Sequence, residues 1–545
     1  MKGPKVQEIQ RADLQRLLER ARPALTAAEY EQLKAALDTL VYLTQLLGQK
    51  NTTIGRLRQI LFGASSEKTA EVLKSLAGKG KPAGEASNAA SAPGADGAAG
   101  GAKDPAAKAP GHGRNGTQDY PGANTVAVEH PSLEPGELCP ECRRGKLYEL
   151  EPGSLVRLTG QAPLGATIYQ LQKLRCNLCL QVFNTPAPEG VGPQKYDAGA
   201  ASMIALLKYG SGVPFYRLEG LQQSLGIVLP ASTQWDIVDP SERLIKPVFE
   251  ELVRQAAQGE IVQNDDTTAK ILARMKPAQE DSTPGKAKRT GIFTTCIVSR
   301  REARTIALFF TGKGHAGENL AQVLAQRAAE LAPPIQMCDG LDHNVPKAFQ
   351  TVLANCLAHA RRKYVEVTPH FPEQCRYVLE TLAEVYRHDA LCREQKLTPQ
   401  ERLAFHQSHS RPLMEALKRW LSEQIDQHRV EPNCGLGEAI GYMNKHWNEL
   451  TLFLRKAGAP LDNNNVEQAL KRAILHRKNA YFYRTDRGAQ VGDTFMSLIH
   501  TCALGEVNAF EYLKALLENA AALCANPAQW MPWNWRDNLP APDSS

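Results

Sequence analysis

Two short apolar segments that end in aspartate constrain the fold of this chain more than any other feature. Ile261–Asp266 and Ile335–Asp339 each have the composition of a strand with acids at its end. Two further apolar runs, Gly291–Val298 and Thr305–Phe310, lie between them, and three strands in succession predict an antiparallel meander. Helical patterns follow at about residues 317–331 and again after Asp339. Strands with helices that return across the sheet predict an α/β core.

A later stretch, residues 460–479, supplies a third acid. Asp462 and Asn463 are residue types that cap helices, because their short side chains bond the free amides of the first turn. Three apolar residues follow at helical spacing: Val466, Leu470 and Ile474. Glu467 falls on the same inward side, where an unpaired carboxylate is costly. An ordinary surface pair with Lys471, four residues on, is the simpler explanation, and convergence with other acids is the alternative.

Carboxylates at two strand ends and on a later helix can meet in three dimensions, and the candidates are Asp265 or Asp266, Asp339 and Glu467. Hard oxygen ligands of this kind select Mg²⁺ or Mn²⁺ over zinc. Such a cluster suits two metal ions about 3.5–4 Å apart that stabilise both oxygens of an in-line phosphoryl displacement. We therefore predict that this cluster of acids forms a catalytic site that binds two Mg²⁺ (or Mn²⁺) ions.

Basic residues gather in the sequence around these acids. One group stands at the entrance to an almost wholly helical stretch, residues 361–459, and the other follows Glu467. A charge run usually marks a solvated face, but two runs that flank an acidic centre favour contacts to DNA phosphates. For His359 a hydrogen-bonded structural role is the alternative. The candidates for DNA binding are His359, Arg361, Arg362, Lys363, Lys471, Arg472, Arg477 and Lys478.

Four of the twelve cysteines have the spacing of metal ligands. They form two C-x₂-C pairs, Cys139 with Cys142 and Cys176 with Cys179, and two such pairs predict one closed, structural Zn²⁺ site. A disulfide or a redox motif is the alternative. Strand character near Leu174 fits a zinc ribbon. The other eight cysteines are scattered singly, and we expect them to be small buried hydrophobes.

The N-terminal region has a heptad pattern over about four repeats. Its seam consists of Leu33, Leu40, Leu47, Ile54 and Leu61, which predicts a coiled coil and therefore a homo-oligomer. An amphipathic helix packed within its own domain is the alternative. From about Gly78 to Gly122 the sequence is rich in Ala, Gly, Pro and Ser, so we expect a disordered linker there.

Residues 200–255 have helical patterns, and residues 218–235 resemble a helix-turn-helix with glycine in the turn. Helix pairs of this kind also occur in many proteins that never touch DNA. The net charge is only +6, so binding of nucleic acid cannot be inferred from the total charge. No uncharged apolar run approaches the roughly 18 residues of a membrane span, and the first residues lack a signal peptide's apolar core. We therefore expect a cytoplasmic protein.

The order of these motifs resembles the insertion-sequence 66 family of DDE transposases. The resemblance runs from about Leu33 to Trp535. The motifs that carry it include Cys356-x-x-His359-x-Arg361-Arg362-Lys363, Asp462-Asn463-x-x-x-Glu467, Arg477-Lys478-Asn479-x-x-Phe482, the Ser497-Leu498 helix and Pro532-Trp533-Asn534-Trp535. The last two core motifs are its most specific parts. It implies a catalytic triad of Asp265, Asp339 and Glu467 with divalent metal. It also implies binding of the element's DNA ends and target DNA, and accessory proteins of the same element, in a bacterial, nucleoid-associated setting.

Two departures from the family pattern leave local assignments open. The family has Asp-Glu-Thr at the first motif, whereas this chain has Asp265-Asp266-Thr267, so either aspartate is a candidate for the first metal ligand. After Asp339 the family tends to have Gly-Tyr and then Tyr-Asn, whereas Gly340–Asn344 here reads Gly-Leu-Asp-His-Asn, which affects a local DNA contact.

These patterns and the resemblance together predict a multidomain α+β protein with an N-terminal coiled coil, a zinc ribbon, and an RNase H-like α/β catalytic core with an all-helical insertion. The expected segments are a leucine-zipper-like region (1–77), the linker (78–125), the zinc ribbon (126–190) and the helix-turn-helix-like segment (191–255). Then follow the first part of the core (256–360), the insertion (361–459), the third-acid helix (460–505) and a C-terminal helix and tail (506–545).

The function that we predict is metal-dependent DNA strand cleavage and strand transfer at the ends of a mobile element. Two alternatives remain at this point. One is a DNA-binding regulator with a zinc ribbon and a coiled coil that carries out no catalysis, and the other is an RNase H-like nuclease that cuts DNA without joining it.

Overall fold

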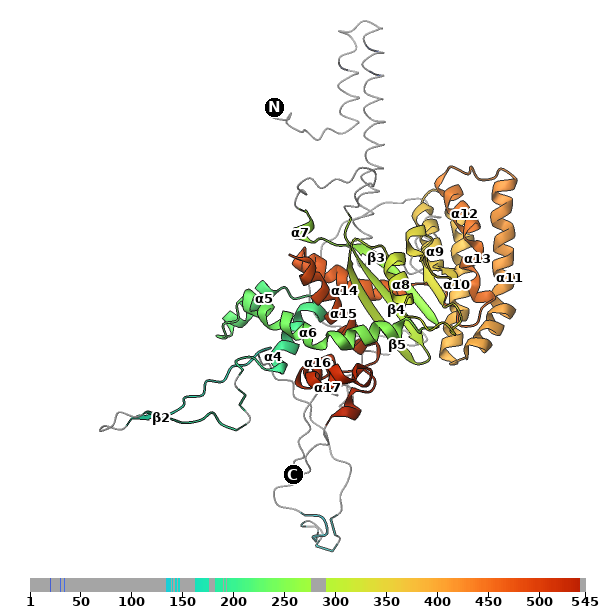
Figure 1. Ribbon diagram of the computed structural model, residues 1–545. Helices are drawn as coiled ribbons and strands as arrows, with labels where there is room; N and C mark the ends of the chain where they lie inside the picture. Colours follow the sequence, from blue (N-terminus) through green and yellow to red (C-terminus); the bar gives the residue numbers. More distant parts are fainter. Residues whose placement is uncertain are drawn as a thin grey trace. The chain divides into compact units, whose positions relative to one another are not determined.

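The computed structural model describes residues 194–275 and 291–539, shorter stretches between 134 and 192, and the isolated positions 20, 30 and 34 (Figure 1). The described chain divides into two compact units. The helical unit comprises residues 357–447 and 453–458. The sheet unit comprises the described residues from 134 to 356, together with 448–452 and 459–539. The predicted heptad seam, linker and four zinc-binding cysteines lie outside the described residues.

A mixed five-stranded sheet forms the centre of the sheet unit (Figure 1). Its strands are β3 (Ile261–Thr268), β4 (Phe293–Arg301), β5 (Arg304–Gly312), β6 (Ile335–Cys338) and β7 (Val352–Asn355). The strand order is β5-β4-β3-β6-β7. β3, β4 and β5 form the predicted antiparallel meander, and β6 and β7 run parallel to β3. The α+β class of this unit is therefore confirmed.

The segment between β6 and β7 corrects one prediction. A helix was expected after Asp339, but the chain forms only a short 3₁₀ turn, η5 (Asp342–Asn344), before it enters β7. The expected helix at 317–331 is shorter than predicted, because α8 spans Ala316–Leu324. Burial explains the strand: Ala354 and Asn355 are buried, and every residue of β7 pairs with β6.

Helices cover both faces of β3. Successive side chains of a strand point to opposite faces, so Gln263 and Asp265 share one face and Asn264 and Asp266 the other. The side chain of Gln263 bonds the start of α14 (Asn464–Ala480). Asp266, on the opposite face, contacts the start of α8. The two aspartates that follow one another in the sequence therefore face different surroundings.

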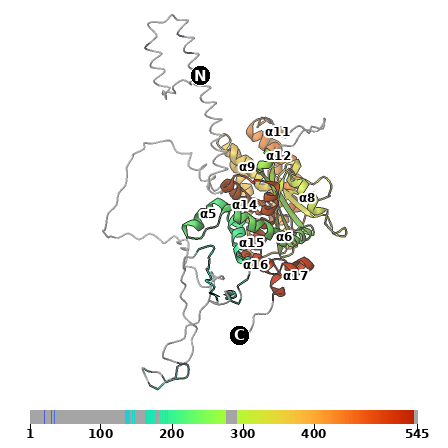
Figure 2. The ribbon, with the colours of Figure 1, turned by 60° about the vertical axis from the view of Figure 1, so that its left-hand side comes forward.

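A third helix, α15 (Asp486–Leu504), packs along β5, the edge strand of the sheet. Figure 2 shows α15 between α14 and α16 (Ala509–Glu518). α15 is buried along most of its length and carries Phe495, Leu498 and Ile499 into the main hydrophobic core.

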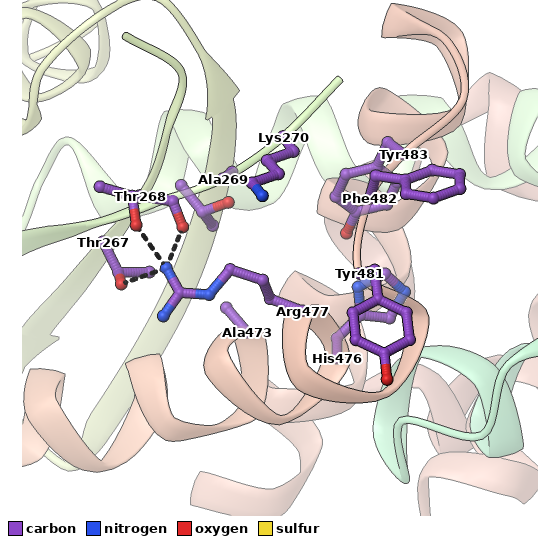
Figure 3. Close-up of a pocket in the computed structure, with 11 residues that line it drawn as sticks. Thr267, Thr268, Ala269, Lys270, Ala473, His476, Arg477, Tyr481, Phe482 and Tyr483 are labelled. Carbon is purple, nitrogen blue, oxygen red and sulfur yellow. Dashed lines mark hydrogen bonds between the residues drawn. The ribbon is translucent and has the colours of Figure 1, made fainter. Parts of the chain in front are cut away.

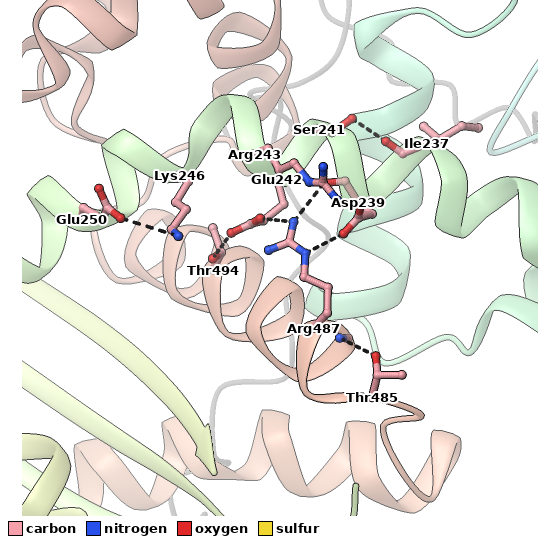
Figure 4. A network of polar contacts seen from close by, with 11 residues as sticks. Ile237, Asp239, Ser241, Glu242, Arg243, Lys246, Glu250, Thr485, Arg487 and Thr494 are labelled. Atoms are coloured by element: carbon pink, nitrogen blue, oxygen red, sulfur yellow. Dashed lines mark hydrogen bonds and ion pairs between the residues drawn. The ribbon is translucent and has the colours of Figure 1, made fainter. Parts of the chain in front are cut away.

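The long helix α6 (Ala231–Ala256) packs against α15 in the same unit. Arg487 at the start of α15 links the two helices, since its guanidinium bonds Asp239 at 2.6 Å and Glu242 at 2.5 Å (Figure 4). The Glu242 carboxylate, 1% exposed, also accepts from the Thr494 hydroxyl at 2.8 Å. A buried charge is thus matched by a cation and a hydrogen bond.

The remaining elements of the sheet unit surround this core. Upstream lie β1 (Lys173–Arg175), β2 (Val182–Asn184), α4 (Ala198–Ala205), the π-helical turn η4 (Leu206–Gly210) and α5 (Phe215–Ser224). α7 (Leu272–Met275) follows β3, and α17 (Ala520–Ala525), η7 (Pro527–Trp530) and η8 (Trp535–Asn538) end the described chain. β1 and β2 pair antiparallel, so the strand expected near Leu174 is present. α5 and α6 form the helix pair predicted at 218–235, with Gly226 at φ 76° between them.

The helical unit overlaps the predicted insertion, residues 361–459, but begins four residues earlier, at Leu357. It contains α9 (Leu357–Val367), α10 (Pro372–Glu394), α11 (Pro399–Asp426) and α12 (Gly435–Lys445). The short elements α13 (Trp447–Leu450) and η6 (Leu452–Leu454) follow at its boundary. Tyr364, Val378, Leu417 and Met443 are fully buried in it. None of the described helices of either unit is long and apolar enough to cross a membrane.

The scattered cysteines are mostly buried, as expected. Cys296, Cys338, Cys356, Cys375, Cys392 and Cys502 are buried. The prediction is wrong for two positions, because Cys434 is partly buried and Cys524 is exposed. Cys434 caps the start of α12, where its sulfur accepts from the Gly437 amide, so its place at the helix end explains its partial exposure.

Candidate active site

Asp265 lies in the second half of β3, and Asp339 directly follows β6, the neighbouring parallel strand. Gln263 pairs with Met337 in the register of β3 and β6, and each aspartate stands two residues beyond that pair. Residues two apart on a strand share a face, and the carboxyl ends of parallel strands meet at one edge. The two carboxylates predicted from the sequence are therefore placed side by side by the backbone register itself.

The pKa of the Asp265 carboxyl group reflects its burial and the acids around it. Burial raises its pKa to about 7, and the negative charges of Asp339, Asp266 and Glu467 add to the shift. The Asp266 amide, which donates to Asp265 Oδ1 at 2.8 Å, opposes it. A carboxyl group whose pKa is raised by burial and by neighbouring carboxylates is typical of functional sites. The three predicted acids are thus within electrostatic range of one another.

Glu467 reaches this region because the start of α14 is bonded to β3. Gln263 Nε2 donates to the Asp462 carbonyl at 3.1 Å, and Asn465 Nδ2 donates to Gln263 Oε1 at 3.2 Å. Asn463 Nδ2 donates to the Asn264 carbonyl at 3.2 Å. These bonds place the first turn of α14, which carries Glu467, beside the middle of β3, directly before Asp265.

The end of β7 lies close to the same turn of α14. The Asn463 amide donates to Cys356 Sγ at 3.3 Å. A carboxylate oxygen of Glu467 lies within 4.8 Å of that sulfur. Cys356 follows β7, the neighbour of the strand that leads to Asp339, so Glu467 stands at the edge of the sheet where both aspartates lie.

The capping expectation for α14 is correct at one residue and wrong at the other. Asp462 accepts from the Asn464 amide at 3.2 Å and from its side chain at 2.8 Å. Asn463 occupies the N-cap position but makes no capping bond with its side chain. That side chain is fully buried and bonds β3 instead, so a tertiary contact replaces the local one.

Asp339 is oriented by the η5 turn, which the sequence did not point to. Asn344 Nδ2 donates to Asp339 Oδ1 in a short hydrogen bond, and the Leu341 amide donates to the same oxygen at 3.3 Å. The carbonyl of Asn344 accepts from Asn264 and Gln336, both at 2.8 Å. Asn344 is 1% exposed, so the residue that holds Asp339 is itself fixed on the sheet.

Asp266 belongs to a different cluster. Its Oδ2 lies 3.1 Å from His315 Nδ1 and accepts from the Ala316 amide at 3.3 Å, both at the start of α8. His343, in η5, has its ring 4.6 Å from the His315 ring. The sequence did not point to this cluster, because its members come from three separate segments.

Arg477 is engaged by β3 (Figure 3). Its Nη1 donates to the Thr268 carbonyl, to the Thr268 hydroxyl at 2.6 Å and to the Thr267 hydroxyl at 3.3 Å. Burial lowers the pKa of this guanidinium. Arg477 therefore fastens the last turns of α14 to the strand that carries Asp265. Its predicted contact with DNA remains a prediction.

The other basic candidates differ in exposure. In the sheet unit, Lys471 and Lys478 are exposed, whereas Arg472 is half-buried and donates to the Gly210 carbonyl at 3.4 Å. In the helical unit, α9 carries His359, Arg361, Arg362 and Lys363. Arg361 is buried, His359 and Arg362 are half-buried, and the Lys363 ammonium lies 4.5 Å from the centre of the Tyr442 ring. Exposed lysines are the groups best placed to meet a phosphate backbone.

A pocket between the end of β3 and the end of α14 adds two exposed aromatic residues (Figure 3). Tyr481 is 64% exposed and Phe482 44% exposed at its rim. The residue that follows them is bonded to the segment after β3. The Tyr483 amide donates to the Lys270 carbonyl at 2.9 Å, and the Leu272 amide donates to the Tyr483 carbonyl at 2.9 Å. The Phe482 position belongs to a motif noted in the sequence, although its exposure could not be inferred from it.

Comparison with known proteins points in one direction. Uncharacterized protein y4hP of Sinorhizobium fredii (strain NBRC 101917 / NGR234) is 26% identical to this chain over 446 residues, which cover 76% of each protein. Uncharacterized protein y4jD of the same strain is 26% identical over 389 residues, 66% of this chain and 71% of that protein. Residues 194–491, which contain Asp265, Asp339 and Glu467, match the transposase IS66 family. The chain therefore belongs to the transposase IS66 family, a family of DDE-type enzymes that catalyse phosphoryl transfer.

Proposed function

We propose that this chain cleaves DNA strands at the ends of a mobile element and joins them to target DNA, with Asp265, Asp339 and Glu467 as its catalytic acids. The observation that carries the proposal is the register of β3 and β6, in which Gln263 pairs with Met337, two residues before Asp265 and Asp339 respectively. The first turn of α14 brings Glu467 within electrostatic range of Asp265. Family membership implies a transposition reaction on DNA.

The topology of the sheet supports an RNase H-like core. The order β5-β4-β3-β6-β7 corresponds to 3-2-1-4-5 when the strands are numbered from β3. The first three strands are antiparallel, and the last two run parallel to the first. Asp265 lies on the first of these strands, and Asp339 directly follows the fourth.

The three acids suit a divalent cation such as Mg²⁺ or Mn²⁺. Burial and mutual repulsion raise the pKa of Asp265 to about 7, so the site gathers negative charge that a cation would balance. Their oxygens are hard ligands, which magnesium and manganese prefer. We propose that Asp265, Asp339 and Glu467 hold two such ions, which would supply Lewis-acid stabilisation of the reacting oxygens.

Asp265, not Asp266, is the better candidate for the first metal ligand. Asp265 interacts electrostatically with Asp339 and Glu467, whereas Asp266 contacts His315 and the start of α8. Asn344 keeps the Asp339 carboxylate in one orientation. Arg477 keeps α14 against β3, so it positions Glu467 relative to Asp265.

Exposed groups near the pocket would hold the DNA. Lys471 and Lys478 are exposed on α14 and can meet phosphates. Tyr481 and Phe482 present flat apolar faces, on which unpaired bases stack in proteins that bind single strands. A strand separated from its partner during cleavage has such bases. The basic residues of α9 are candidates for further phosphate contacts.

Three further parts of the proposal concern a zinc site, self-association and partner proteins. The residues of the first two lie outside the part of the chain that the structure describes. We propose that Cys139, Cys142, Cys176 and Cys179 bind one structural Zn²⁺, since their spacing matches a closed four-thiolate site. The heptad seam would join copies of the chain. Accessory proteins of the same element are further candidate partners.

The test uses the purified full chain and labelled duplexes that carry the DNA flanking its reading frame. We expect nicks and joined products that require Mg²⁺ or Mn²⁺. Asp339→Ala should lower strand transfer at least about a hundredfold, because even residues that only support metal ligands are worth 10–100-fold. Binding of the ends should remain. Glu330→Gln removes an exposed acid of the same unit and serves as the matched control.

The outcomes separate the three functions. Metal-dependent cleavage and joining that Asp339→Ala abolishes supports a transposase. Cleavage without joined products indicates a nuclease. DNA that is bound but never cut with either metal would overturn the catalytic proposal and leave a DNA-binding regulator. Equal loss of binding and strand transfer in Asp339→Ala would contradict the role given to Asp339.

A further inference from the structure

Asp266, His315 and His343 form a compact cluster of potential metal ligands. Each residue offers one ligand atom, and these atoms all lie within 4.8 Å of one another. Asp266 lies in the second half of β3, His315 immediately before α8 and His343 in η5. Three segments that are far apart in the sequence thus contribute one ligand each.

The first two ligands are already fixed in place. The Asp266 side chain is 11% exposed, and its Oδ2 lies 3.1 Å from His315 Nδ1. The backbone amide of His315 donates to Glu318 Oε2 at 2.9 Å, which anchors the start of the helix. The centre of the His315 ring lies 4.3 Å from the centre of the Phe293 ring and 4.6 Å from the centre of the His343 ring. Fixed ligands lower the ordering cost of binding an ion.

The third ligand comes from a turn that packs directly on α8. A Cβ placed on Gly317 would lie 2.6 Å from the Val345 carbonyl oxygen and 2.7 Å from that of His343. The backbone of η5 therefore touches the first turn of α8 where glycine leaves room. His343 itself is exposed, so its ring can turn towards the other two ligands.

We propose that Asp266, His315 and His343 bind one transition-metal ion of the zinc class, at a site separate from the catalytic acids. Imidazole nitrogens suit zinc, nickel, cobalt and copper, whereas magnesium prefers an all-oxygen site. Two histidines and one carboxylate are three protein ligands, which leave a coordination position for water. The opposite direction of the Asp265 and Asp266 side chains on β3 separates this site from the predicted magnesium site.

An ion at this site would position Asp339 indirectly. It would join β3, α8 and η5, and η5 also carries Asn344, which donates to Asp339 Oδ1. His343 and Asn344 are adjacent, so fixing one restrains the other. These three ligands are thus positioning residues for the acid at the end of β6. The ion-binding part of the inference stands independently of the proposed function.

The test measures the zinc content of the purified full chain. Wild type, Asp266→Asn, His343→Gln and the control His370→Gln are stripped with chelator, dialysed against Zn²⁺ and analysed by atomic emission. His370 is an exposed histidine of the helical unit. Zinc on the predicted cysteine site contributes equally to all four proteins. We expect the two cluster variants to lose one equivalent of zinc relative to wild type and the control.

Cobalt distinguishes the two kinds of site. Co²⁺ bound by thiolates gives a near-ultraviolet charge-transfer band, and Co²⁺ bound by imidazole and carboxylate gives only visible bands. We expect His343→Gln to lose visible absorption while the charge-transfer band stays unchanged. His343 is exposed, so this variant should fold, as circular dichroism can verify. The same zinc content in all four proteins, or the same cobalt spectrum in wild type and His343→Gln, would overturn the proposal.

Discussion

The backbone amide of Phe309 in the edge strand β5 donates to the hydroxyl of Ser497 in α15, 2.9 Å away. The same contact recurs on both sides, from Ala307 to Thr501 Oγ1 at 3.1 Å and from Thr311 to Asp493 Oδ2 at 2.7 Å. Four residues of helix advance about 6 Å and two residues of strand about 6.8 Å, so the two spacings nearly match. A ladder of helix side chains thus satisfies the outward amides of the sheet edge, which would otherwise be open to pairing with another chain.

Ser497→Ala should loosen this edge. The buried amide of Phe309 would lose its acceptor, at a cost of about 1–3 kcal/mol. Because the chain has two compact units, local hydrogen exchange measured by mass spectrometry is the suitable readout. Exchange of peptides from residues 304–312 should become faster. Ser408→Ala, at an exposed position of α11, is the control and should leave that exchange unchanged. Unchanged exchange in Ser497→Ala would mean that the ladder does not stabilise the edge strand.

Asp493→Asn should change how stability depends on pH. Burial raises the pKa of Asp493 to about 8, although the two hydrogen bonds from Thr311 oppose the shift. Between about pH 4 and 8 the folded state therefore holds a proton that the unfolded state has released, so stability falls as pH rises, by up to about 1.4 kcal/mol per unit. The asparagine variant lacks this proton. Thermal unfolding should show that wild type loses more stability between pH 5 and pH 8 than the asparagine variant does. An equal loss of stability in both proteins would contradict a raised pKa for Asp493.

Arg487→Met should destabilise the contact between α6 and α15 (Figure 4). Glu242 would keep its buried charge but lose its cation, which costs about 3–5 kcal/mol for fully buried pairs. Arg487 is 30% exposed, so the lower end of that range is expected. The double variant Arg487→Met/Glu242→Gln removes both charges and should recover part of the loss. Thermal unfolding measures the stability of both variants. A double variant that is no more stable than Arg487→Met would argue against this explanation.

Phe482→Ala should weaken binding of single-stranded DNA. Stacking of one base on an aromatic side chain is worth about 1–3 kcal/mol, so the dissociation constant should rise roughly five- to 150-fold. Fluorescence anisotropy with a labelled oligonucleotide measures this constant. Phe482→Leu keeps the apolar volume without the flat face and should lose nearly as much. Tyr377→Ala, at an exposed tyrosine of the helical unit, is the control. Full binding by both Phe482 variants would exclude stacking at this position.

The sheet and its acids could be predicted because their signals are local. Apolar runs that end in aspartate mark β3 and β6, and the helical spacing behind Asp462 marks α14. By contrast, β7 is only four residues long, and its pairing with β6 comes from tertiary contact. A short apolar run of that length does not distinguish a strand from a helix by its period.

The polar contacts of the sheet edge and of the site could not be predicted from the sequence, because they also depend on tertiary contact. Asp493, Ser497 and Thr501 recur every four residues and share one face of α15, but nothing local indicates that this face meets a sheet edge. Asn344 and His343 become informative only when η5 lies beside Asp339 and α8. Residues that act through partners distant in the sequence carry no periodic signal.

Gly317→Ala should separate η5 from α8 and so test their coupling to Asp339. The added methyl group would meet two backbone carbonyl oxygens at 2.6 and 2.7 Å, and backbone cannot move aside as cheaply as a flexible side chain. Overpacking of this kind typically costs 1–3 kcal/mol. Hydrogen exchange of residues 340–346 should become faster, and cleavage should need more Mg²⁺ because Asn344 no longer holds Asp339 in place.

Gly312→Ala is the matched control for this prediction, because it lies five residues away in the same unit and has no atom within 4 Å of its added Cβ. It should behave as wild type in both measurements. The two readouts separate structure from function, since exchange reports the contact between η5 and α8 whether or not the chain cleaves DNA. Faster exchange with an unchanged magnesium requirement would mean that η5 moves without disturbing Asp339. Unchanged exchange would mean that the glycine is not needed for the close approach.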